Sequence, residues 1–121
     1  MREAHRTYTK VAKHTASARE LEADLLLTAA ARLQAICDSW DMKKPELEGA
    51  LLYNRKLWSV FMTSATNPQN PLPINLRQNV ANLGLFVFHQ TLAIMINPQP
   101  DRLGSLININ RELAAGLRSA A

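Results

Sequence analysis

Residues 74–96 have the sequence INLRQNVANLGLFVFHQTLAIMI and lie between Pro73 and Pro98. At 100° per residue, a helix over this segment has two apolar stripes on nearly opposite sides. The first stripe contains Leu76, Val80, Leu83, Val87 and Ile94; the second contains Ile74, Leu85, Phe88, Leu92 and Ile96. A helix that is apolar on two sides must be covered on both. The segment therefore predicts the central helix of a bundle, or a helix with one side left for a partner.

The same segment is the nearest approach to a membrane span in the 121-residue chain. Its apolar part, residues 80–96, is shorter than the roughly 20 residues that a span needs. It also contains Asn82, His89, Gln90 and Thr91. We therefore expect a helix inside a protein core and no membrane insertion.

Three further helices are expected around this one. A capping box at Ser17 and Glu20 predicts a helix over 17–39. Its inward stripe would contain Leu21, Leu25, Ala29, Leu33, Ile36 and Trp40, with Asp24 and Leu27 facing away.

Prolines set the remaining boundaries. Pro45 suits the first turn of a helix over 45–65, and a fourth helix is expected over 101–118. The inward stripe of the 45–65 helix would contain Leu47, Leu51, Leu57, Trp58, Phe61 and Ala65, and that of the 101–118 helix Leu103, Leu106, Ile107, Leu113 and Leu117. Residues 67–73 contain three prolines and should form an extended connection. No segment shows the alternation of a strand, so the fold class is all-α, a compact bundle of four main helices.

The positive charge is concentrated at the start of the chain. The net charge is +4. Residues 1–19 hold five basic residues against Glu3, whereas residues 20–121 hold nine charges of each sign. This distribution predicts a flexible basic arm over 1–14, followed by a single helical domain over 15–121.

Residues suited to catalysis or metal binding do not share a motif. His5, His14, His89 and Cys37 lack metal-ligand spacing, and there is no glycine-rich phosphate loop. We expect no enzyme activity, no cofactor, no metal and no small-molecule substrate. A single cysteine and an N-terminus without the apolar stretch of a secretory signal favour the cytoplasm.

Two asparagines lie where leucines would be expected. Asn54 falls mid-stripe between Leu51 and Leu57, and Asn110 between Ile107 and Leu113. A buried amide without partners costs about 1–3 kcal/mol, so both should be hydrogen-bonded. We interpret them as a structural polar layer that fixes the register of the helices, as single buried asparagines do in coiled coils.

Motifs along the whole chain resemble the FlaF family of flagellar biosynthesis regulators from alphaproteobacteria. They are the YNRKLW motif at 53–58, NPLP at 70–73 with Leu76, Arg77 and Asn79, LGLFV at 83–87, and LININRE at 106–112 with Gly116 and Leu117. The resemblance extends to the entry of the first helix, AKHTASARELE at 12–22.

The resemblance implies a cytoplasmic, non-enzymatic protein that promotes flagellin production and filament assembly. It implies action alongside the regulator FlbT and binding of flagellin before export. The second stripe of the 74–96 helix, Ile74, Leu85, Phe88, Leu92 and Ile96, is our candidate partner-binding surface. The alternative is an RNA-binding regulator that acts on flagellin mRNA through the basic arm, with a steep salt dependence of binding.

Overall fold

The computed structural model describes the backbone of residues 2–119 and the side chains of residues 18–119. The described backbone is helical, with turns and no strand. Its elements are α1 (Arg2–Asp38), α2 (Trp40–Lys43), the 3₁₀ helix η1 (Lys44–Glu46), α3 (Leu47–Ala65), α4 (Ile74–Ile96), the 3₁₀ helix η2 (Pro100–Leu103) and α5 (Gly104–Ser119). The all-α prediction is confirmed.

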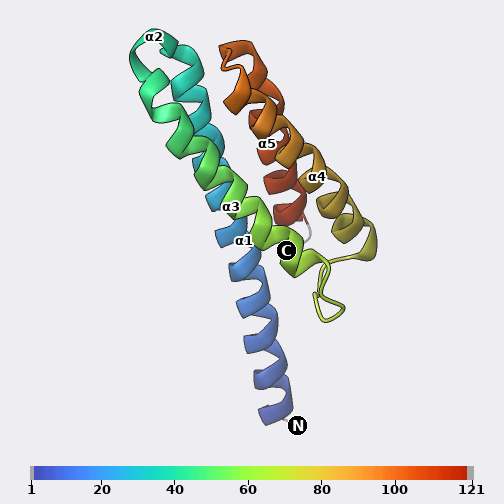
Figure 1. Cartoon of the computed structure of the whole chain (residues 1–121). Coiled ribbons are helices and arrows are strands. Elements are labelled where there is room, and N and C mark those ends of the chain that lie inside the picture. The colour runs from blue at the N-terminus through green and yellow to red at the C-terminus, as the bar shows by residue number, and fades with distance from the viewer. Residues whose placement is uncertain (1, 120–121) are drawn as a thin grey trace.

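The four long helices run alternately up and down along the bundle (Figure 1). α1 packs most extensively against α5 and also against α3. α4 packs mainly against α3, and its contact with α5 is smaller. α4 therefore stands at one corner of the bundle, where one side of it has a neighbour and the other does not.

The start of α1 differs from the sequence prediction. The helix begins at Arg2, fifteen residues before Ser17, and its first turns extend beyond the end of the bundle (Figure 1). The Ser17–Glu20 motif lies inside the helix, so it does not act as a capping box. No proline or glycine interrupts residues 2–38, so nothing in the local sequence ends the helix there. The predicted flexible arm covers residues 1–14. Residue 1 and the side chains of residues 2–14 lie outside the described part of the structure, so the flexibility of this arm remains a prediction.

The buried stripe of α1 is also rotated from the expected one. Leu21 was expected inside and is 61% exposed, whereas Leu26 is fully buried. Leu27, expected to face away, packs against the core. Residues 21–27 include leucines at 21, 25, 26 and 27, and the periodicity alone does not decide which of them meets α5.

The two connections are fixed by polar and proline residues. Between α1 and α3, the Lys44 ammonium lies 5.9 Å from the centre of the Trp40 ring. Between α3 and α4, the Asn70 side chain donates to the Ser64 carbonyl at 3.0 Å, and its Oδ1 accepts from the Leu72 N–H at 2.8 Å. The expected extended connection over 67–73 is therefore non-helical and held by side-chain hydrogen bonds.

The core lies between α1, α3 and α5. Trp58 of α3 is completely buried, and its ring meets that of Phe61 edge to face at 6.3 Å. All five expected core residues of the last helix are buried, namely Leu103, Leu106, Ile107, Leu113 and Leu117. α4 adds Val80, Val87 and Ile94 from its first stripe.

Candidate functional site

The candidate site is the second apolar stripe of α4, which we call the apolar face of α4: Ile74, Leu85, Phe88, Leu92 and Ile96. Helix α4 begins and ends where the sequence predicted, at residues 74 and 96. Pro73 fixes the chain before it, and the Arg77 guanidinium donates to the Ala65 carbonyl at 3.0 Å, which ties its first turn to the end of α3. The face is thus carried by a regular helix anchored at its start.

Most of this apolar face is accessible. Leu85 and Leu92 are each 57% exposed, and Ile74 and Ile96 are more exposed still. Phe88 differs from the other four, because it is partly buried and packs against the core. The structure therefore places four of the five residues on the surface, with Phe88 between them and the interior.

The register of α3 on α4 shows what flanks this face. Gly84 of α4 lies against the Met62 side chain, so close that a Cβ at position 84 would collide with the thioether. At the other end, Leu51 of α3 and Met95 of α4 line the same shallow pocket. The helices are antiparallel, so Arg55, two turns before Met62, lies beside the α4 segment two turns after Gly84. That segment carries Leu92, and Phe88 lies about one turn before it.

Other apolar side chains are exposed on the same two helices. Phe86 is 45% exposed on α4, and Leu52, Tyr53 and Val60 are exposed on α3. None of them belongs to an inward stripe predicted from the helical periodicity, so their exposure agrees with the sequence.

The two asparagines are fully buried and bonded to each other. The Asn110 amide donates to Asn54 Oδ1 at 2.7 Å and to the Leu26 carbonyl at 3.3 Å. Its own Oδ1 accepts from Trp58 Nε1 at 2.8 Å. The network joins α1, α3 and α5 at one level of the bundle, while Asn54 Nδ2 has no hydrogen-bond partner among the described residues. Asn110 is therefore the centre of the network.

A pocket of about 190 Å³ opens at the end of the bundle, beneath the α3–α4 connection. Phe61, Val80 and Leu113 are among its apolar lining, and Arg19 and Glu22 of α1 stand beside it. Burial raises the pKa of the Glu22 carboxyl, and the Arg19 guanidinium opposes this by a smaller amount. Arg19 also donates to the Pro71 carbonyl at 3.3 Å, which ties the connection to α1.

Groups with reactive side chains are dispersed. Among residues 18–119, no three His, Cys, Asp or Glu side chains gather into a group that could hold a metal ion. His89 is exposed on α4. Cys37 is partly buried, and its thiol lies 3.4 Å from the Pro100 carbonyl oxygen. The clustered feature of this surface is thus apolar.

α4 is long and apolar enough to cross a membrane, and it is the one helix with these properties in the described part of the chain. Helices in the cores of soluble proteins can have the same length and composition. α4 carries Arg77 near its start and buries Thr91 against the rest of the bundle, where its hydroxyl donates to the Val87 carbonyl at 2.6 Å. Its packing against α3 and α5 fits a helix of the bundle.

Comparison with known families gives a match over nearly the whole chain. The model of the family described as flagellar protein FlaF matches residues 4–117. Neither the curated proteins nor the solved structures contain a match.

Proposed function

Because the chain belongs to the FlaF family of flagellar proteins, we propose that it is a non-enzymatic regulator that promotes flagellin synthesis and filament assembly by binding flagellin. It would act in the cytoplasm as a chaperone-like adaptor, together with FlbT. The observation that carries this proposal is the accessible apolar face of α4.

The form of the face supports a helical partner. Leu85, Phe88, Leu92 and Ile96 follow each other at intervals of three and four residues, so they make one continuous strip along α4. An amphipathic helix binds such a strip by inserting its own apolar residues at the same intervals. A terminal helix of flagellin, kept from self-association before export, is the partner that this geometry suits.

The test is the affinity for purified flagellin, measured by titration calorimetry. Leu92→Asp places a charge in the middle of the strip and should weaken binding by at least about tenfold, because a carboxylate next to an apolar partner must be desolvated. The melting temperature should stay within a few degrees, since Leu92 is mostly exposed.

A matched control is available on α1. Leu21→Asp changes a leucine of similar exposure on a helix outside the face, and it should leave the affinity unchanged. Phe88→Asp separates two roles for the partly buried ring: global unfolding would make Phe88 a core residue, whereas lost binding with the fold intact would make it part of the face. Equal affinity of Leu92→Asp and the wild type would contradict the proposed site.

The RNA-binding alternative has a distinct signature. It expects binding of flagellin mRNA that falls steeply with salt and disappears when residues 2–14 are deleted. Flagellin binding that the same deletion variant retains would favour a function carried by the bundle. RNA binding that the wild type shows and the deletion variant loses, with no flagellin binding by either protein, would favour the alternative.

A further inference from the structure

The α3–α4 hairpin has an unusual distribution of charge. From Gly49 to Pro100 the sequence contains no aspartate and no glutamate. The same stretch holds three permanently basic residues, Arg55, Lys56 and Arg77. It covers all of α4 and all of α3 after the first turn. The ten acidic residues of the chain all lie outside this stretch.

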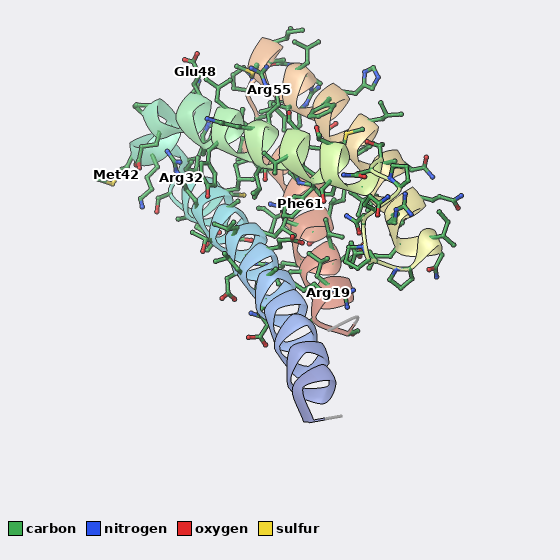
Figure 2. The ribbon with its side chains drawn as sticks, turned by 90° about the horizontal axis from the view of Figure 1, so that it is seen from below. Arg19, Arg32, Met42, Glu48, Arg55 and Phe61 are labelled. Carbon is green, nitrogen blue, oxygen red and sulfur yellow. The ribbon has the colours of Figure 1, made fainter. Side chains whose placement is uncertain are left out.

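The three cations occupy different places. Arg77 donates to the Ala65 carbonyl within the hairpin, so its guanidinium is engaged in holding the fold. Arg55 and Lys56 are both exposed on α3. As consecutive residues they project about 100° apart, and Lys56 lies in a shallow pocket with Ser59 and Val60 of α3. Figure 2 shows Arg55 on the outer side of α3, opposite to Phe61, which points between the helices. Because of the α3–α4 register, Arg55 borders the strip beside Leu92, one turn from Phe88.

No carboxylate among the described side chains forms an ion pair with either of these two cations. The ion pair among the described side chains joins Arg118 of α5 to Asp24 of α1, at 2.6 Å. The closest acidic residue along α3 is Glu48, which lies on the same side as Arg55 but two turns away, about 10 Å along the helix axis. The face is therefore bordered by a cation beside Leu92, whereas Glu48 lies at its C-terminal end, in the pocket with Met95 and Pro98.

We propose that the partner helix that binds the apolar face of α4 has an acidic border, which lies against Arg55 of α3, with Lys56 adding to the positive potential on the same helix. This inference rests on the proposed function and adds the charge of the partner. The apolar strip would supply most of the affinity. The cations would set the orientation of the helix and raise its rate of association, as complementary charges at an interface do.

Two designed peptides test the charge of the partner without flagellin. Both are amphipathic helices of 18 residues with the same leucine stripe, and their polar positions are glutamate in one and lysine in the other. The acidic peptide should bind the full-length protein about tenfold more tightly in 50 mM salt. The preference should shrink toward unity in 1 M salt, where charges are screened beyond about 3 Å.

Charge reversal shows whether the two cations cause this preference. Arg55→Glu combined with Lys56→Glu should reverse the order of the two peptides. Both side chains are exposed, so the melting temperature should be unchanged. Arg111→Glu, an exposed arginine on α5, is the matched control and should keep the wild-type preference. Equal binding of both peptides, or a preference that the double variant retains, would overturn the inference.

Two further outcomes separate related ideas. If the acidic peptide binds preferentially but flagellin does not bind, the proposed function fails while the charge of the partner stands. The second outcome is measured with vesicles containing 30% phosphatidylglycerol. Binding to them through Arg55 and Lys56, with neither peptide bound, would overturn the inference in favour of an anionic lipid surface.

Discussion

α4 and α5 are neighbouring helices, and they use their apolar residues differently. α5 buries its apolar residues on one side, and its other side carries polar residues such as Asn108, Arg111 and Glu112. α4 buries Val80, Val87 and Ile94 but exposes leucines and isoleucines on its second side. The rest of the chain covers the single apolar side of α5. α4 has two apolar sides, and the rest of the chain covers only one of them.

The largest expected effect compares one leucine from each helix. Leu106→Ala in α5 removes a fully buried side chain and should lower the free energy of unfolding by about 2–5 kcal/mol. Leu92→Ala in α4 removes a mostly exposed one and should change it by less than about 0.5 kcal/mol. Urea denaturation followed by circular dichroism measures both. A large loss for Leu92→Ala would mean that the second side of α4 is covered in solution.

The next-largest expected change in stability concerns the hydrogen-bond network around Asn110 of α5, which includes no residue of α4. Asn110→Ala leaves Trp58 Nε1 and Asn54 Oδ1 without their partner and should destabilise the fold by about 1–3 kcal/mol. Asn108→Ala, on the exposed side of α5, is the control and should be nearly neutral. The shift of the Trp58 indole N–H resonance reports the lost bond directly, and an unchanged resonance would contradict the network.

Two glycines, Gly104 at the start of α5 and Gly84 in α4, should give smaller and opposite changes in stability. Around Gly104, at the start of α5, nothing lies within 4 Å of an added Cβ, so Gly104→Ala should stabilise the protein by about 0.5–1 kcal/mol. Gly84→Ala in α4 would push against Met62 and should destabilise it by about 1 kcal/mol or more. Thermal melting should therefore move in opposite directions for the two variants. A rise for both would show that Met62 yields without cost.

The smallest effect is a pH dependence near the pocket at the end of the bundle. Burial gives Glu22 a higher pKa in the folded state than in the unfolded state. Its contribution to stability is therefore fully present below the unfolded pKa and is lost as the pH rises through the folded pKa. Glu22→Gln should then be slightly more stable than the wild type at pH 7, by less than about 1 kcal/mol because the group is half exposed, and this difference should vanish near pH 3. Melting curves at pH 3, 5 and 7 check it, and a gap that widens toward low pH would contradict the assignment.

Prolines and apolar periodicity made part of the structure predictable. Pro73 and Pro98 bound α4 within a residue or two, because a proline ring cannot continue a helix. In α3 and α5 one stripe is clearly more apolar than the rest, and most of its residues are buried as expected. In α1 the leucines at 25, 26 and 27 made several rotations equally apolar, and the predicted stripe was wrong at Leu21.

The sequence by itself determined the all-α class, the bounds of α4, the position of both asparagines within apolar stripes and the existence of a second apolar side on α4. Each of these follows from local rules, since proline geometry and helical periodicity act within a few residues. Only the tertiary structure decided that Trp58 and Asn54 both hydrogen-bond to Asn110. It also decided that Phe88 is partly buried while Leu85 and Leu92 are exposed, and that Arg55 lies beside Leu92. These depend on the rotation and register of one helix against another, which are set by contacts such as Met62 on Gly84 between residues far apart in the chain.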